Sequence, residues 1–256
     1  MSALGIASIF FVCTVCAGLL GCVLHTKLPE QQRETRTTDV VKLVMGLIAT
    51  ASALILGLLI ASAQSSYNTQ RDDLEKMAAD TVEMDRLLAF YGSETQEARV
   101  SLRQVVIALH DAVWLKDNVK IEDLDPVRIR TQADKLAHEI LNLTPKTESQ
   151  RAIFGQITQL ALSLAQLRLL LFQHVGGSIS PPFLILLIFW TSILFLGFGL
   201  LSRFNTTIAA TFLVGALSVS AAMFIILELD RPYGGFIRLS DTPLREALAQ
   251  LGQQQE

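Results

Sequence analysis

The sequence predicts an all-α protein with four transmembrane spans and a large helical-bundle domain inserted between spans 2 and 3. Of its 256 residues, 51% are hydrophobic and only 18% are charged, whereas soluble domains contain about 25% charged residues. Four runs lack Asp, Glu, Lys and Arg altogether: residues 1–26, 43–70, 169–202 and 204–227. Because a helix crosses the bilayer core with about 20 apolar residues, these runs indicate a membrane protein.

We expect the spans near residues 3–25, 42–63, 181–201 and 206–227. The first is a retained span rather than a secretion signal, because it has no basic start and is too long for a signal core. Near the span ends, five Lys or Arg lie on one side of the membrane and six on the other, which favours neither side. The basic loop that follows the uncharged N-terminus favours a cytoplasmic position for that loop. The helical bundle would then lie outside the cytoplasm.

Residues 64–180 hold 13 Lys or Arg and 16 Asp or Glu, so they form a hydrated domain. Apolar residues recur there at steps of three and four, which predicts amphipathic helices. Gly92 ends the first helix, and Ser93 with Gln96 is a capping box for the second. Asp125-Pro126 opens the third, and the fourth begins near Thr147. The expected inward residues are Leu74, Met77, Thr81, Met84, Leu88 and Tyr91; Leu102, Val105, Val106, Leu109 and Val113; then Ile129, Ala133, Leu136 and Ile140.

The fourth bundle helix carries a 3.5-residue seam of Ile153, Ile157, Leu160, Leu164, Leu167 and Leu171. Such a seam is typical of a bundle core or of a contact between subunits, and both interpretations stay open. The helix should break at Gly176-Gly177 and Pro181-Pro182. No Gly or Pro lies between Leu58 and Tyr91, so the second span should continue into the bundle as one helix.

Several function classes are excluded by residue type and position. A net charge of −3 gives no basic surface for nucleic acid. Cys13, Cys16 and Cys22 all lie in the first span and form no disulfide framework. The histidines are scattered, and neither a phosphate-binding loop nor a nucleophile elbow is present. We therefore expect no enzyme, no cofactor and no metal site, and the lack of ionisable groups inside the spans argues against proton relay.

Small residues form a stripe on one face of the second span: Gly46, Thr50, Ala53, Gly57 and Ala61, continuing to Gln64. Thr207, Thr211, Gly215, Ser218 and Ala222 do the same on the fourth span. Such a stripe is typical of close helix packing, and the alternative is an uncharged pore wall. In that alternative Leu54 or Leu58 would close the pore by dewetting. Four helices are too narrow to enclose a pore, which would need a cyclic oligomer.

The C-terminal tail, residues 229–256, is the most distinctive stretch. Glu228, Asp230 and Arg231 stand at the membrane boundary, followed by the turn Pro232-Tyr233-Gly234. Thr242-Pro243 then opens a short helix. Its charges fit an interfacial anchor, and an ion-facing vestibule or a latch on the bundle are the alternatives. The division expected is 1–63, 64–180, 181–228 and 229–256.

The tail E-L-D-R-P-Y-G-G-F-I-R-L-S-D-T-P-L, with V-V-K-L-V-M-G-L-I-A-T and L-L-I-A-S-A-Q-S-S-Y-N-T-Q of the second span, resembles a bacterial bestrophin-like family of unknown function across essentially the whole chain. Bestrophins resemble it more distantly, through four spans and an acid-x-acid-x-Pro-aromatic-Gly pattern. Glu228, Asp230, Pro232, Tyr233 and Gly234 match that pattern.

The resemblance implies a pentameric ion channel whose second span lines the pore, with an apolar neck as its gate. Two features depart from bestrophins. Gly235-Phe236-Ile237-Arg238 stands where they carry a run of acids, so we expect no calcium dependence from that site. The second span also lacks the phenylalanine that they use in the neck. Bestrophins keep the large domain in the cytoplasm, opposite to the charge-based expectation.

The sequence thus predicts a passive ion channel in the bacterial plasma (inner) membrane. Its partners would be the lipid bilayer, further copies of itself, with a pentamer suspected, and a permeant inorganic ion. The alternative is a non-conducting membrane scaffold or sensor whose helical domain docks a partner protein.

Overall fold

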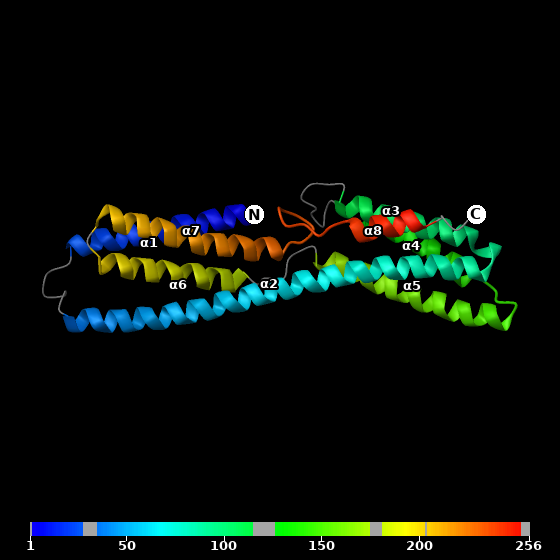
Figure 1. Ribbon diagram of the computed structural model, residues 1–256, viewed down its shortest axis with the longest axis horizontal. Coiled ribbons are helices and arrows are strands. Elements are labelled where there is room, and N and C mark those ends of the chain that lie inside the picture. The colour runs from blue at the N-terminus through cyan, green and yellow to red at the C-terminus, as the bar shows by residue number, and fades with distance from the viewer. Residues whose placement is uncertain (1, 28–34, 115–125, 175–180, 203, 252–256) are drawn as a thin grey trace. The chain divides into compact units, whose positions relative to one another are not determined.

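The fold was examined in a computed structural model, which describes residues 2–27, 35–114, 126–174, 181–202 and 204–251 (Figure 1). These residues form helices and no strands, so the predicted all-α fold is confirmed for the described chain. The helices are α1 (Ala3–Lys27), α2 (Thr35–Tyr91), η2 (Ser93–Thr95), α3 (Gln96–Trp114), α4 (Pro126–Leu141), α5 (Glu148–His174), α6 (Pro181–Leu200), α7 (Thr206–Leu229) and α8 (Thr242–Gln250).

The chain divides into two compact units. Unit 1 comprises Met1–Ser66 and Ser178–Asp230, and unit 2 comprises Tyr67–Gly177 and Arg231–Glu256. Unit 2 therefore takes in chain from both sides of α6 and α7. Insertion of the bundle between spans 2 and 3 stays a prediction, as does the boundary of a separate interfacial tail at residue 229.

Within the described residues, four helices are long and apolar enough to cross a membrane, which agrees with the four predicted spans. They are Ala3–Lys27, Asp39–Tyr91, Pro182–Leu200 and Thr206–Leu229. The helix predicted to run without a break through Leu58–Tyr91 is confirmed, and it begins earlier, at Thr35. The break predicted at Gly176-Gly177 lies outside the described residues, and Pro181 of the predicted Pro181-Pro182 break is the first residue of α6.

Unit 1 is held together by close backbone contact as well as by apolar side chains. A Cβ atom on Gly21 of α1 would collide with the carbonyl oxygen of Leu196 of α6, and one on Gly199 would collide with that of Gly18. Lipid tails are as apolar as leucine, so the hydrophobic effect does not drive helices together within a bilayer. Close packing of the helices stabilises their association instead. A separate apolar core cluster of unit 1 includes Phe10, Leu187, Met223 and Ile226.

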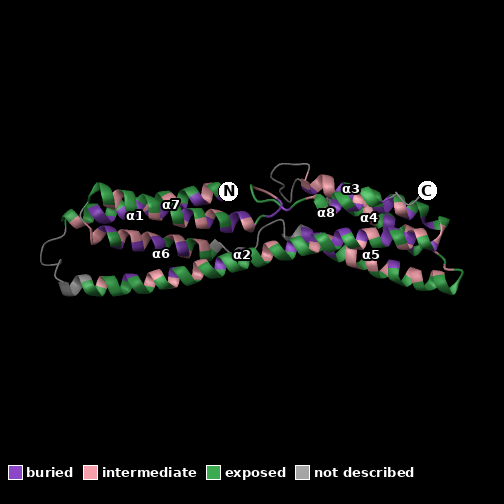
Figure 2. Ribbon diagram, in the orientation of Figure 1, coloured by how far each residue is buried: buried purple, intermediate pink, exposed green. Residues whose placement is uncertain are grey.

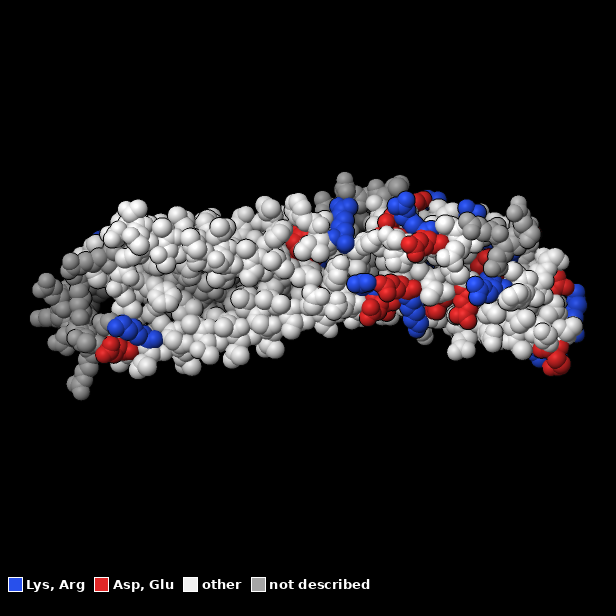
Figure 3. Space-filling model, in the orientation of Figure 1, with Lys and Arg blue, Asp and Glu red and all other residues white. Residues whose placement is uncertain are grey.

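Unit 2 is a bundle of the second part of α2 with α3, α4, α5 and α8. All six inward residues predicted on α2 are buried. The other two stripes are buried except for Val105 and Ala133, which are half-buried. The 3.5-residue seam of α5 packs within the chain's own core clusters, which supports its intramolecular interpretation. Figure 2 shows the buried stripes, and Figure 3 shows that charged side chains gather over this unit.

The predicted helix ends are partly confirmed. Gly92 follows the last residue of α2 with φ of 136°, in the region that glycine favours. The capping box of Ser93 and Gln96 is wrong, because a short 3₁₀ turn intervenes and α3 begins at Gln96. The hydroxyl of Thr95 instead donates to the carbonyl oxygens of Leu88 and Gly92.

The N-terminus of α5 is capped as predicted. The Thr147 hydroxyl oxygen accepts a hydrogen bond from the backbone N–H of Gln150 at 3.1 Å. Asp125, the predicted cap of α4, lies outside the described residues, although α4 does begin at Pro126.

Candidate functional site

The membrane part of α2 exposes a face that no other described part of unit 1 covers. All eight predicted pore-lining residues are exposed: Gly46, Thr50, Ala53, Leu54, Gly57, Leu58, Ala61 and Gln64. The buried residues of the same stretch are Met45, Ser52, Leu59 and Ala63. Their steps of seven, seven and four place them together on one side of the helix. The predicted stripe therefore lies on the side of α2 that turns away from α1, α6 and α7.

The glycines of this stripe have open space beside them. No atom lies within 4 Å of a Cβ built on Gly46 or Gly57, whereas Gly21 and Gly199 would meet backbone atoms. Among the described residues of one chain, no helix therefore packs closely against Gly46 or Gly57 of the stripe. On α7 the matching stripe is mixed, because Thr207, Thr211 and Ser218 are exposed but Gly215 would bring a Cβ to 3.2 Å from Phe195.

The exposure of α2 differs from that of the other candidate spans. In its most apolar stretch only 11% of the residues are buried, against 39% for α1, 28% for α6 and 33% for α7. A helix with so little cover in its own chain needs lipid, water or a second protein surface around it. Figure 2 shows this half of α2 mostly in the colour of exposed residues.

The chemistry of the face is uncharged. From Leu43 to Gln70, α2 contains no acidic or basic side chain. The hydroxyl of Thr50 donates to the carbonyl oxygen of Gly46 at 2.9 Å, and its oxygen keeps lone pairs that point outward. Leu54 and Leu58 are 65% and 70% exposed. The face thus combines weak oxygen ligands with bulky leucines that repel water.

The C-terminal motif contains two buried carboxylic acids. Glu228 and Asp230, at the end of α7 in unit 1, are each only 5% exposed. Arg231, the first residue of the second segment of unit 2, is exposed, and Gly234 is half-buried. Their predicted roles, as an anchor or as an ion-facing vestibule, stay predictions.

Tyr233 and Pro232 are buried in unit 2 rather than exposed on a tail. The Tyr233 ring meets the Trp114 ring edge-on, with centroids 6.1 Å apart. Burial raises the pKa of the Tyr233 phenol, and the charge of Asp73 raises it further. This observation agrees with the latch on the bundle that the sequence left open.

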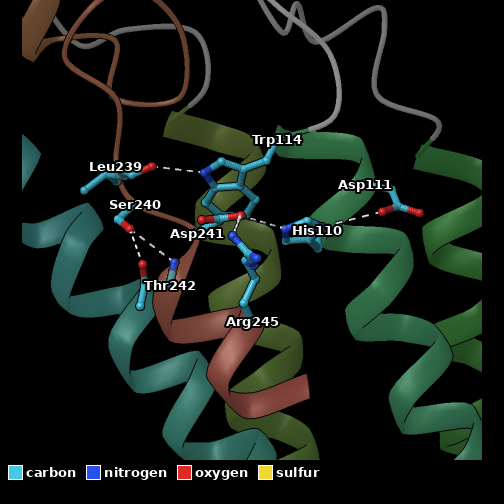
Figure 4. A network of polar contacts seen from close by, with 8 residues as sticks. All are labelled: His110, Asp111, Trp114, Leu239, Ser240, Asp241, Thr242 and Arg245. Atoms are coloured by element: carbon cyan, nitrogen blue, oxygen red, sulfur yellow. Dashed lines mark hydrogen bonds and ion pairs between the residues drawn. The ribbon is translucent and has the colours of Figure 1, made fainter. Parts of the chain in front are cut away.

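Polar contacts join the segment from Leu239 to Asp241 to side chains of α3 (Figure 4). The Trp114 indole donates to the carbonyl oxygen of Leu239 at 3.0 Å, and its ring stacks on that of His110. The Nε2 atom of His110 lies 3.1 Å from Oδ2 of Asp241, the residue that precedes α8. From the sequence we expected His110, like the other histidines, to be a surface or interfacial side chain. Its partner lies 131 residues away, so no spacing rule connects the two.

No group of three or more His, Cys, Asp or Glu side chains in the described residues is placed to hold a metal ion. Cys13 and Cys16 are exposed, Cys22 is buried, and all three are free thiols.

Comparison with known proteins identifies relatives of the whole fold. A family model described as Bestrophin-like domain matches residues 12–244. No curated protein matches the chain.

Crystal structures of three mutants of a bacterial bestrophin homologue from Klebsiella pneumoniae are similar to this fold. One superposes with a TM-score of 0.69 at 15% identity, over 96% of this chain and 99% of that one. The other two give TM-scores of 0.65 at 14% identity, over 96% of this chain and 99% or 98% of theirs. At such identity the likeness shows a shared fold. Because the family model covers most of the sequence, the chain belongs to the Bestrophin-like domain family.

Proposed function

We propose that the protein is a passive ion channel of bestrophin-like type, formed by several copies with α2 of each copy lining the pore. The observation that carries this proposal is the uncovered stripe on α2, where all eight predicted residues are exposed within the chain. Family membership supports it, because the resemblance to bestrophins implies channel activity. Conduction and the pore-lining role are what the experiment below tests.

The stripe fits a water-filled passage better than a lipid contact. Hydrocarbon tails are matched by large apolar side chains, and α2 offers these at Leu43 and Leu47, which are 75% and 72% exposed. Gly46, Thr50 and Ala53 instead present small side chains and one hydroxyl oxygen, which can coordinate an ion only weakly. Narrowing by Leu54 and Leu58 would expel water and close the passage.

The passage needs more than one chain. One copy has a single α2, and its remaining candidate spans pack on the opposite side of that helix. Rotational symmetry would bring several α2 helices around one axis, and the resemblance to bestrophins favours five. The permeant species would be a small inorganic ion, and the channel would lie in the bacterial plasma membrane with its sidedness open.

Calcium should not regulate the channel through the C-terminal motif. Gly235-Phe236-Ile237-Arg238 contains no carboxylate, and Ca²⁺ requires six to eight oxygen ligands. We therefore expect flux to be the same with and without calcium at this site.

The test is ion flux through liposomes that contain the purified protein. Wild-type protein should dissipate an ion gradient, and Ala53→Trp should abolish the flux while the oligomer stays intact. Ile185→Trp is the matched control, because Ile185 is 66% exposed on α6 and its substitution should leave flux unchanged.

Two results would contradict the proposal. One is absence of flux from the wild-type protein in every salt tested. The other is an Ala53→Trp protein that loses its assembly rather than its flux, which would favour the non-conducting scaffold or sensor.

A further inference from the structure

A cavity of about 200 Å³ lies inside unit 2, where the second part of α2 meets α3, α4 and α5. Met77, Met84, Leu102 and Leu136 contribute buried apolar surface to its wall. Methionine side chains are flexible and polarizable, so such a wall adapts to guests of different shape. A cavity of about 150 Å³ already binds benzene, so this one has room for an apolar body of roughly six to eight carbon atoms.

Alanines keep the cavity open between α4 and α5. Ala133 and Ala137 stand one turn apart on α4, and Ala161 and Ala165 do the same on α5. Ala137 and Ala165 are exposed, so the cavity opens to the surface between these two helices. Bundle cores are normally filled to close packing by larger side chains. The space is therefore a feature of the side chains chosen at these four positions.

Arg168 of α5 also lines this cavity, and its side chain is half-buried. No hydrogen bond or ion pair joins its guanidinium to another residue in the described part of the chain. Burial lowers the pKa of Arg168, and the nearby charges of Asp134 and Arg130 act in opposite directions. An arginine keeps its proton throughout the physiological range. The cavity therefore carries a fixed cation whose donors have no partner among the described residues.

The surrounding charges do not replace a partner for Arg168. Asp134 also lines the cavity, but its carboxylate lies 3.7 Å from Nε of Arg130, with which it forms an ion pair. Among the described residues, two guanidinium groups thus lie near one carboxylate in this part of the bundle. A bound anion would restore the balance.

We propose that this cavity binds a small monocarboxylate, with its apolar body between the four helices and its carboxylate on Arg168. A guanidinium binds a carboxylate through two parallel charge-assisted hydrogen bonds, which sets both orientation and preference for an anion. An alcohol with the same body would fill the same space without that pair. The site lies wholly within unit 2 and does not depend on ion conduction.

The test is photolabelling of the full-length protein with a diazirine-bearing carboxylic acid of about eight carbons, matched to the cavity volume. Peptide mapping should place the label on α4 and α5 residues that line the cavity. Excess octanoate should displace it, whereas octan-1-ol at the same concentration should not.

Two pairs of variants separate the charge from the cavity. Arg168→Met should weaken competition by octanoate roughly 10- to 100-fold, and Arg103→Met, at an exposed arginine of α3, should leave it unchanged. Because no described residue pairs with Arg168, we expect its replacement to leave the thermal unfolding midpoint unchanged. Ala161→Leu fills the cavity and should abolish labelling, while Ala152→Leu, on the exposed side of α5, should not.

Three results would overturn the proposal. They are label spread over the helices of unit 1, equal displacement by octanoate and octan-1-ol, and unchanged octanoate competition in Arg168→Met. If Ala161→Leu fails to fold, the Arg168→Met comparison still decides.

Discussion

The two parts of α2 show how differently one helix is used in the two units. In unit 2, residues such as Leu74, Met84 and Leu88 point into a core and are at most 2% exposed. In unit 1, leucines of the same helix, such as Leu47 and Leu58, are at least 70% exposed. The more apolar part is thus the less buried part. The hydropathy of a helix indicates which medium surrounds it. An apolar helix face is expected to be buried inside the chain only where the surrounding medium is water.

Glycine shows the same contrast inside unit 1. Gly21 and Gly199 let two backbones meet, so their missing side chains are required by packing. No described atom lies within 4 Å of a Cβ built on Gly46 or Gly57, so the described chain does not require these residues to be small. The proposed passage shared between copies would account for their small size. Substitutions that separate the two uses follow, in order of expected effect.

Gly21→Leu should have the largest effect, because any side chain there collides with backbone atoms of α6. We expect a loss of at least about 3 kcal/mol, enough to prevent recovery of a monodisperse protein in detergent. Gly57→Leu should be recovered like the wild type, because the space beside Gly57 is open. Equal yields of the two variants by size-exclusion chromatography would contradict the contrast.

Leu88→Ala and Leu58→Ala compare the two parts of α2 directly. Leu88 is fully buried, so its truncation should lower the free energy of unfolding of unit 2 by roughly 3–4 kcal/mol. Leu58 is 70% exposed, and its truncation should cost less than about 1 kcal/mol in fold stability. Urea unfolding followed by Trp114 fluorescence in a Trp190→Phe background measures the first. The thermal unfolding midpoint in detergent measures the effect of Leu58→Ala. If Leu58→Ala destabilised the protein as much as Leu88→Ala does, the contrast between the two parts of α2 would be refuted.

Asp85→Asn tests a nearly buried ion pair that α2 makes inside unit 2. The carboxylate of Asp85 accepts two hydrogen bonds from Arg99, at 2.8 and 2.9 Å, and both side chains are nearly buried. Removing one partner leaves a poorly solvated charge, so we expect a loss of about 2–3 kcal/mol by the same urea assay.

Glu75→Gln is the matched control for Asp85→Asn. Glu75 pairs with Arg71 at 2.8 Å on the exposed side of α2. Both side chains are well exposed to solvent, so its loss should change the free energy of unfolding far less than Asp85→Asn does. If the two variants lost the same stability, burial would not be the cause.

The smallest effect concerns pH. The folded unit raises the pKa of Tyr233 above the ordinary value, so the folded state holds the phenolic proton more tightly than the unfolded state. Its contribution is complete below about pH 10 and declines as pH rises beyond that, by at most about 1.4 kcal/mol per pH unit. Tyr233→Phe should remove that part of the decline between pH 9 and 11 in urea unfolding. A slope unchanged by the substitution would show that Tyr233 ionises freely.

Local patterns in the sequence predicted most of the helices. The charge-free runs located the four candidate spans, and the spacing of residues such as Leu74 and Ile157 located the buried stripes. Both signals arise within a few turns of one helix, so they need no knowledge of the rest of the fold. The capping box at Ser93 failed because Thr95 offered a competing hydroxyl that bonds back to Leu88.

Long-range contacts could not be predicted in this way. The ring of Tyr233 contacts the ring of Trp114, and the carboxylate of Asp241 contacts His110. No helical periodicity predicts either contact. The stripe on α2 was found from its residue types, but small residues suit both close packing and a pore wall. The open space beside Gly46 and Gly57 shows only that the described part of one chain does not pack closely there, and the pore wall stays a proposal.

Water access to α2 in the assembled protein tests the central claim most directly. In a background with Cys13, Cys16 and Cys22 replaced by alanine, Ala53→Cys and Ile185→Cys would each be reconstituted in liposomes and treated with a membrane-impermeant charged thiol reagent. We predict that the cysteine at position 53 reacts and that ion flux falls, whereas the cysteine at position 185 stays unmodified in lipid. An unreactive cysteine at position 53 in a conducting protein would contradict a pore lined by α2.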